Sequence, residues 1–225
     1  MIRATRPGTL SESIVTGTER VLVLAPHTDD GEFGCGGTIA RLVELGKEVY
    51  YVAFSSAEKS LPEGADAGAL KKEVRQALLV LGIPLDHLLL FDYDVRNFPA
   101  HRQEILEDMV RLYRETNPSL ILLPSTTDTH QDHQTVSVEG FRAFKHTSIL
   151  GYELPWNNLT FETNAFAALD PRHLEAKLNA LSCYRSQAGR IYSDRDFVEG
   201  LARTRGTQIG TKYAEAFEVI RWILL

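Results

Sequence analysis

Short apolar runs alternate with segments of helical period through the first half of the chain, and this alternation constrains the fold more than any other feature. The run Arg20–Ala25 is rich in valine and leucine and is followed by proline, which predicts a strand buried on both faces. Between residues 36 and 45 apolar residues recur at near-helical spacing and end at Gly46, which predicts a helix. Strands that alternate with helices pair in parallel through right-handed crossovers. We therefore predict an α/β fold with a Rossmann-like, doubly wound, mostly parallel sheet.

The same alternation continues along the chain and loosens after about residue 145. The remaining predicted strands cover 48–54, 87–91, 119–123, 149–154, 165–169 and 216–220. The remaining predicted helices cover 69–81, 102–115 and a segment from Pro171, capped by Asp170, to about Cys183. We predict a single domain over residues 1–225, with a looser C-terminal portion from about residue 146.

Composition and charge exclude several classes of protein. The formal net charge is −6 and the basic residues are scattered, which argues against a nucleic-acid partner. No apolar run reaches the ~18 residues of a membrane span, and the segment 1–20 has no long apolar core of a signal peptide. Cys35 and Cys183 lie far apart and are predicted to be small buried hydrophobes. We expect a cytoplasmic protein without a membrane partner, and a homo-oligomer stays open.

Two polar segments follow predicted buried strands directly. Residues 26–32 are Pro-His-Thr-Asp-Asp-Gly-Glu, and residues 128–133 are Asp-Thr-His-Gln-Asp-His. In open α/β sheets ligands bind outside the carboxyl ends of the strands, so both segments are expected at one edge. Imidazole and carboxylate suit zinc, and a catalytic zinc takes three protein ligands and keeps one position open. The pair of segments therefore predicts a metal site.

Two other interpretations of these segments are a turn with a helix cap and a phosphate-binding turn. Either segment alone is explained by a turn and a helix cap, and only their joint occurrence favours a metal. The glycines at 31, 34, 36 and 37 suggest a phosphate-binding turn. They match neither nucleotide-binding spacing, and the carboxylates among them would repel an anion. These glycines are better explained by close helix packing or positive φ.

The two segments resemble the hallmarks of the PIG-L/LmbE-like deacetylase family, which are Ala-His-Pro-Asp-Asp-Glu and a later His-x-Asp-His. Further similarity lies within 177–187 and 214–217, so the likeness runs from about Arg20 to Ile220. The chain departs from the family pattern at Thr28, where proline is usual, and at Gly31, which separates the second aspartate from the glutamate. The family's Arg-x-x-Glu is also missing, because leucine precedes Glu73 at that spacing.

The resemblance implies a role for each polar residue. His27, Asp30 and His133 would hold the metal. Asp29 would be the general base, and His130 would donate a hydrogen bond to the oxyanion. Asp132 would either orient His130 or cap the helix that follows. The candidate substrate-binding residues are Asp92, Asp94 and Arg96, which follow the predicted strand 87–91, and Lys72, which lies on the preceding predicted helix 69–81.

The predicted function is that of a metal-dependent hydrolase acting on an N-acetylated sugar. It would remove the acetyl group from an N-acetylglucosamine-containing small molecule, a glycoconjugate or a sugar nucleotide, through attack of a metal-bound water. One Zn²⁺ per chain is expected, although other divalent metals can occupy such a site. Two alternatives stay open: a conjugate amidase acting on a larger amide, and a non-catalytic sugar-binding protein on the same fold.

Overall fold

The computed structural model describes residues 18–57 and 68–224. Most of the N-terminal segment used above to predict the cellular location lies outside the described residues. The helices are α1 (Asp30–Glu44), α2 (Ala69–Val80), α3 (Arg102–Thr116), α4 (Gln131–Ala143), α5 (Pro171–Leu181) and α6 (Arg195–Gln208). The strands are β1 (Arg20–Ala25), β2 (Glu48–Ala53), β3 (Leu88–Leu90), β4 (Leu120–Pro124), β5 (Ser148–Tyr152), β6 (Ala165–Leu169) and β7 (Tyr213–Arg221). None of the described helices is long and apolar enough to cross a membrane.

One sheet of seven strands, in the order β3-β2-β1-β4-β5-β7-β6, forms the centre of the molecule. The first five strands in this order pair in parallel, and β7 runs antiparallel to both β5 and β6. The prediction of a doubly wound, mostly parallel sheet is confirmed. The chain leaves β1 toward β2 on one side and returns to β4 on the other. The carboxyl ends of β1 and β4 therefore form a topological switch point, where ligands bind in such sheets.

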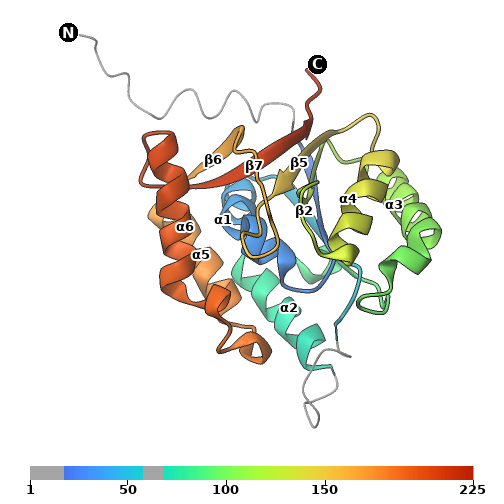
Figure 1. Cartoon of the computed structure of the whole chain (residues 1–225), viewed down its shortest axis with the longest axis horizontal. Helices are drawn as coiled ribbons and strands as arrows, with labels where there is room; N and C mark the ends of the chain where they lie inside the picture. Colours follow the sequence, from blue (N-terminus) through green and yellow to red (C-terminus); the bar gives the residue numbers. More distant parts are fainter. Residues whose placement is uncertain (1–17, 58–67, 225) are drawn as a thin grey trace.

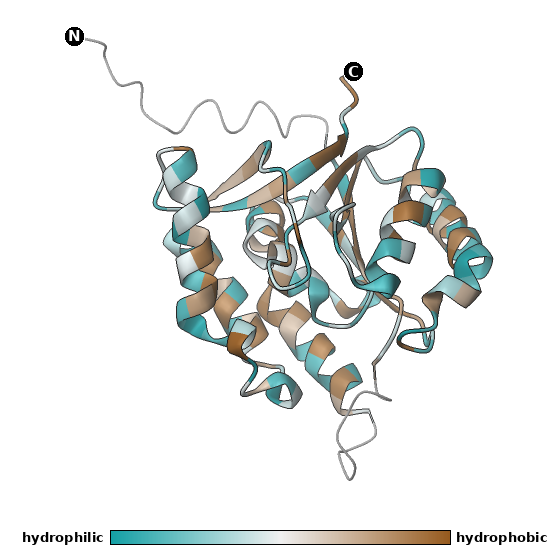
Figure 2. Ribbon diagram, viewed as in Figure 1, coloured by the Kyte–Doolittle hydropathy of each residue, from teal (hydrophilic) through white to brown (hydrophobic). Residues whose placement is uncertain are grey.

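Helices cover both faces of the sheet (Figure 1). α3 and α4 lie on one face, while α1, α2, α5 and α6 lie on the other. Val21 and Val23 of β1 belong to the core beneath α1, α2 and α5, and Leu22 and Leu24 belong to the core beneath α3 and α4. Apolar residues accordingly concentrate in the strands and on the inner sides of the helices (Figure 2). The predicted burial of β1 on both faces is confirmed.

The observed elements differ from the predicted ones at several points. α6 was absent from the predicted set, and α4 was expected only as a helix of unstated length after Asp132, whereas its N-cap is His130. α1 begins at Asp30, ahead of the predicted start at residue 36. The inward face of α4 carries polar groups, among them His133 and Ser137, so it lacks the apolar periodicity that marks a helix. The strands after residue 145 pair with the same sheet, which supports the proposal of one domain.

Helix α1 is broken at Cys35, where φ is −146° and ψ is 25°. The Glu215 carboxylate of β7 accepts hydrogen bonds from the backbone N–H groups of residues 37 and 38, at 3.0 and 2.6 Å. Lys177 of α5 donates to the Phe33 carbonyl at 2.7 Å and pairs with Glu215 at 2.7 Å. This buried ion pair therefore satisfies backbone groups that the break leaves without helical partners.

The glycines of α1 allow the helix to lie close to the sheet. A Cβ on Gly34 would lie 2.2 Å from the Tyr152 ring of β5, and one on Gly37 would lie 2.5 Å from Leu169 of β6. Real Cβ atoms do not approach other atoms so closely. Of the two explanations given for these glycines, close helix packing is confirmed and positive φ is wrong, because none of the glycines at 31, 34, 36 and 37 has a positive φ.

Removing one partner of the buried pair should destabilise the fold strongly. Lys177→Met leaves the Glu215 carboxylate buried without its counter-ion, and we expect the free energy of unfolding to fall by about 3 kcal/mol or more. The double variant Lys177→Met/Glu215→Gln removes that unpaired charge and should recover part of the loss. Denaturant unfolding of both variants measures this coupling.

An exposed ion pair provides the matched control. Arg203 and Glu199 lie one turn apart on α6 at 2.7 Å, with the arginine side chain 60% exposed. Arg203→Met should unfold almost as the wild type does, because solvent screens exposed pairs. The account of the break in α1 is wrong if Lys177→Met unfolds at the same denaturant concentration as Arg203→Met.

Candidate metal centre and its pocket

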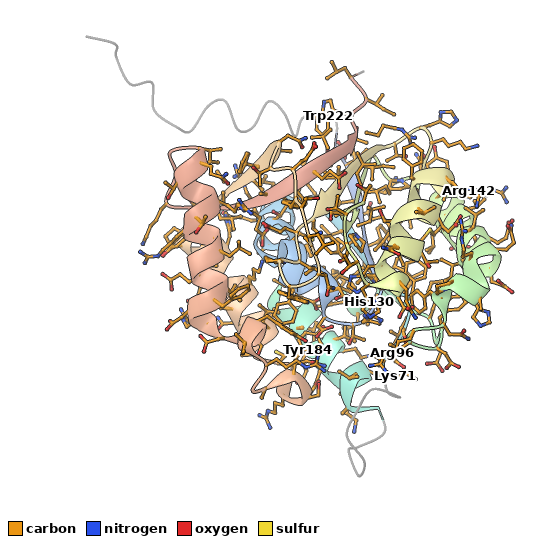
Figure 3. All side chains as sticks on the ribbon, in the orientation of Figure 1. Lys71, Arg96, His130, Arg142, Tyr184 and Trp222 are labelled. Carbon is orange, nitrogen blue, oxygen red and sulfur yellow. The ribbon has the colours of Figure 1, made fainter. Side chains whose placement is uncertain are left out.

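The two polar segments meet at the switch point between β1 and β4. A pocket of about 380 Å³ opens there, at the end of the sheet where His130 and Arg96 lie (Figure 3). It is lined by His27, Asp29, Asp30, Phe33, Ala57, Val95, Arg96, His130, His133, Trp156, Asn157, Gln187, Arg190 and Tyr192. The prediction that both segments reach one edge of the sheet is confirmed.

Three side-chain atoms converge within this pocket. Asp30 Oδ2 lies 3.1 Å from His27 Nδ1 and 3.2 Å from His133 Nε2. The two ring nitrogens lie 3.4 Å apart. A tetrahedral zinc with bonds of about 2.0–2.1 Å separates its ligand atoms by about 3.3 Å. The triangle therefore has the dimensions of three ligands around one such ion.

Two carboxylates determine which ring nitrogens face the triangle. His27 Nε2 donates to Asp132 Oδ2 at 3.0 Å, and His133 Nδ1 donates to Asp128 Oδ2 at 2.8 Å. With those nitrogens protonated, a neutral ring presents a lone pair from its other nitrogen to Asp30. Three lone-pair atoms at such distances repel one another unless a cation or a proton lies between them. The donor set therefore fits a metal whose histidine ligands are oriented by carboxylates.

The charges of this cluster are strongly coupled. Burial disfavours the charged rings, but the Asp30 carboxylate and the carboxylate hydrogen bonds outweigh it and raise the pKa of His27 to about 9 and of His133 to about 10. Burial would likewise raise the pKa of Asp30, yet the two rings lower it well below its usual range. Without a metal, protons therefore occupy the positions that a cation would take.

His130 provides a second candidate set. One nitrogen from each of His27, His130 and His133 lies within 4.8 Å of the other two. This is a looser triangle than the one that includes Asp30. His130 is also the N-cap of α4, and its Nδ1 accepts the backbone N–H of Asp132 at 3.2 Å. We therefore favour Asp30 as the third ligand, with the His130 proton on Nε2.

The carboxylate of Asp132 contacts a different histidine from the one expected. The sequence predicted that its carboxylate orients His130, but their closest approach is 4.0 Å, and the carboxylate binds His27 instead. The same carboxylate accepts the backbone N–H groups of Arg96 at 2.6 Å and Phe98 at 3.4 Å. Arg96 has a φ of +67°, a conformation disfavoured for arginine that turns its N–H toward the site.

Asp29 lies beside the triangle, on the wall of the pocket. Burial and the neighbouring Asp30 charge raise the pKa of Asp29 to about 6. His130 behaves oppositely, because burial and the two other rings lower its pKa. In the metal-free chain at neutral pH the pocket thus holds a carboxylate able to accept a proton and a neutral imidazole able to donate a hydrogen bond.

Glu32 supports the loop from behind and does not line the pocket. It is fully buried and contacts the hydroxyl groups of Tyr51 and Tyr184. Those hydroxyls also lie within hydrogen-bonding distance of the Thr28 carbonyl, at 3.0 and 2.7 Å. Burial raises the pKa of Glu32 to about 8. The two tyrosines thereby fix the loop that carries His27 and Asp29.

The predicted substrate-binding residues divide into two groups. Arg96 lines the pocket, whereas Asp92, Asp94 and Lys72 are not among the lining residues. Asp92 instead accepts a hydrogen bond from Ser56 at 2.9 Å.

Several functional candidates were not predicted from the sequence. Asp128 could have been found, because it lies five residues before His133 in the motif, a spacing that suits a carboxylate orienting a histidine. The other new lining residues were given no role, and apart from Phe33 they carry no motif: Phe33, Ala57, Val95, Trp156, Asn157, Arg190 and Tyr192. For Gln187 the sequence left two interpretations open, contact with the substrate and the end of a helix, and the structure places it on the lining of the pocket.

Comparisons with known proteins agree with this fold. The diacetylchitobiose deacetylase of Thermococcus kodakarensis is 25% identical over 92% of this chain and 85% of its own length. The solved N,N'-diacetylchitobiose deacetylase of Pyrococcus horikoshii superposes with a TM-score of 0.78 at 21% identity, covering 97% of this chain and 95% of that one. A 4-carboxy-2-hydroxymuconate hydratase of Pseudomonas putida reaches 0.72 at 18% identity, covering 92% and 98%. The structural likenesses establish the fold alone, since one of these proteins is a hydratase.

The family follows from the sequence itself. The model of the PIG-L family, described as GlcNAc-PI de-N-acetylase, matches residues 22–144. This range is more than half of the chain and contains both polar segments of the candidate metal centre. The chain belongs to the PIG-L, or GlcNAc-PI de-N-acetylase, family.

Proposed function

We propose that this chain is a zinc-dependent N-deacetylase that hydrolyses the acetamido group of a small molecule containing N-acetylglucosamine. The observation that carries the proposal is the convergence of His27, Asp30 and His133 within 3.4 Å, beside Asp29 and His130 in one pocket. Membership of a de-N-acetylase family and similarity to diacetylchitobiose deacetylases support the choice of substrate.

The roles of the side chains follow from their positions. His27, Asp30 and His133 would hold a divalent cation, which would polarise the amide carbonyl and acidify a water molecule. Asp29, on the wall beside them, would take the proton from the attacking water and return it to the leaving amine. His130 would donate its Nε2 hydrogen to the oxygen that becomes negatively charged.

Zinc is favoured because two imidazole nitrogens and one carboxylate oxygen suit it, and because three protein ligands leave a position for substrate. Elemental analysis of the purified protein should find one equivalent of zinc per chain. A protein that is metal-free and does not bind zinc at micromolar concentration contradicts the proposal.

The carboxylates that orient the histidines should control metal affinity. Asp128→Ala and Asp132→Ala remove the hydrogen-bond partners of His133 and His27, so zinc affinity should fall about 10- to 100-fold. Asp92→Ala is the matched control, because its carboxylate contacts Ser56 and none of the three ligands. Competition with a chromophoric chelator measures all three affinities. Equal zinc affinities of all variants and the wild type would contradict the proposal that Asp128 and Asp132 orient the ligands.

The two adjacent aspartates should differ in what their loss changes. Asp29→Asn should retain zinc while turnover falls about 10²- to 10⁴-fold, because asparagine cannot accept the proton. Asp30→Asn and His133→Ala should lose zinc itself, whereas His130→Ala should retain zinc and lose rate. Metal content and kcat are measured together for all four variants. If Asp29→Asn loses zinc while Asp30→Asn keeps both zinc and rate, the two assignments are exchanged.

An acetate-release assay tests the reaction. The panel contains N-acetylglucosamine, its glycosides, sugar nucleotides and chito-oligosaccharides, each assayed with a chelator and after zinc is returned. Chelator-sensitive release from at least one of them is expected. Release only from compounds with a larger acyl group supports a conjugate amidase, and no release by zinc-loaded protein supports a sugar-binding protein instead.

A further inference from the structure

Three aromatic side chains form one wall of the pocket, and the mechanism above uses none of them. The rings of Trp156 and Tyr192 stack with centroids 4.2 Å apart and an interplanar angle of 14°. Phe33 contacts both edge-to-face, at 5.4 and 5.5 Å. Trp156 remains 37% exposed although it belongs to the lining of the pocket. We call Phe33, Trp156 and Tyr192 the aromatic wall.

The aromatic wall is attached to both segments of the candidate metal centre. Phe33 follows Asp30 by three residues on α1, and its backbone N–H donates to the Asp29 carbonyl at 3.1 Å. On the other side, the carbonyl of Asn157, next to Trp156, accepts the backbone N–H of Thr129 at 3.0 Å and its hydroxyl at 2.8 Å. Thr129 directly precedes His130. The wall is therefore held in a defined position relative to the reacting groups.

A buried amide oxygen lies at the same pocket without a partner. Gln187 is a lining residue, and among the described residues its Oε1 is buried and accepts no hydrogen bond. An unpaired buried acceptor costs free energy that a donor from a ligand would recover. This is an observation independent of the aromatic wall, and it too indicates a bound molecule with a donor group.

A pyranose ring has the chemistry that this arrangement would recognise. Its C–H groups present an apolar face that packs on an aromatic surface, while its hydroxyl groups at the rim donate hydrogen bonds. Ligand pockets typically combine such apolar walls with a few placed polar groups. The wall beside the metal-binding triangle and the amide nearby would hold the ring and so direct its substituent toward Asp29.

We propose that the aromatic wall binds the pyranose ring that carries the acetamido group, with Gln187 accepting a hydrogen bond from one of its hydroxyl groups. This inference rests on the proposed deacetylase function and assigns Trp156 as its main specificity-determining residue. It selects sugars over acyclic acetamides, because an acyclic chain offers no flat face to the wall.

Kinetics of the zinc-loaded protein test the wall. With N,N'-diacetylchitobiose, Trp156→Ala should raise KM roughly 10-fold, the effect of losing a stacked aromatic contact, and leave kcat nearly unchanged. Trp156→Phe should retain most of the affinity, and Gln187→Ala should raise KM by less. Trp222→Phe is the control, because Trp222 lies at the top edge of the view in Figure 3, away from His130, and does not line the pocket. An unchanged KM in Trp156→Ala overturns the proposal, and a lower kcat alone indicates a merely structural role.

Fluorescence separates this inference from the proposed function. The chain has two tryptophans, so Asp29→Asn/Trp222→Phe leaves Trp156 as the only one in a slowly reacting protein. Titration with N,N'-diacetylchitobiose should change its emission saturably, whereas N-acetylethanolamine should not. If the emission changes in this way but the wild type releases no acetate, the proposed sugar-binding wall is retained and the proposed deacetylase function is rejected. Acetate release without any emission change retains the deacetylase and rejects the wall. If neither is observed, both are rejected.

Discussion

The convergence of three acceptor atoms is the constraint on which the rest of the site depends. Asp30 and two histidine nitrogens lie within 3.4 Å of one another, an arrangement that is unfavourable without positive charge between them. In the metal-free chain protons supply that charge, which is why the pKa values of both rings are raised. Protons and a divalent cation compete for the same lone pairs. Positive charge from either source therefore suits this geometry, in which the three proposed ligand atoms already lie at the spacing expected around a zinc ion.

Such a cluster has to be held by the fold around it, and the support comes from distant parts of the chain. Asp132, at the start of α4, accepts a hydrogen bond from His27 in the loop after β1, and the backbone N–H groups of residues 96 and 98 donate to Asp132 in turn. The hydroxyl groups of Tyr51 and Tyr184 donate hydrogen bonds to the Thr28 carbonyl and so hold the loop that follows β1. Behind the loop, the broken helix α1 is stabilised by the buried pair of Lys177 and Glu215. Lys177 and Glu215, from the two later regions of family similarity, thus stabilise the helix that follows the first motif, although neither of them lines the pocket.

The sequence predicted the parts of the structure that local patterns determine. Alternating apolar runs were sufficient for the doubly wound sheet, and two short motifs were sufficient to identify the residues that converge at its edge. The extent of α4 was not recognised because its buried face carries His133 and other polar groups, so the apolar spacing that marks a helix is absent. α6 was not recognised because it has two glycines and few apolar residues. Which histidine the Asp132 carboxylate contacts depends on how β1 lies beside β4. The aromatic wall depends on how Trp156 and Tyr192, whose segments show no recognisable sequence pattern, lie against α1. Neither is encoded in residues that are neighbours along the chain.

The fold by itself does not select the reaction, since a hydratase has the same architecture. What distinguishes this chain is which side chains occupy the switch point. A hydrolase of amides needs a proton acceptor next to the bound water and a donor next to the carbonyl oxygen, on groups whose protonation states differ. Asp29 and His130 satisfy that requirement, because burial raises the pKa of the carboxyl and lowers that of the imidazole. The same burial shifts the pKa of an acid and of a base in opposite directions, so one pocket can supply both of the groups that the proposed reaction needs. In the proposed arrangement neither Asp29 nor His130 contacts the face of a sugar ring, so a preference for sugars would have to come from the aromatic wall beside them.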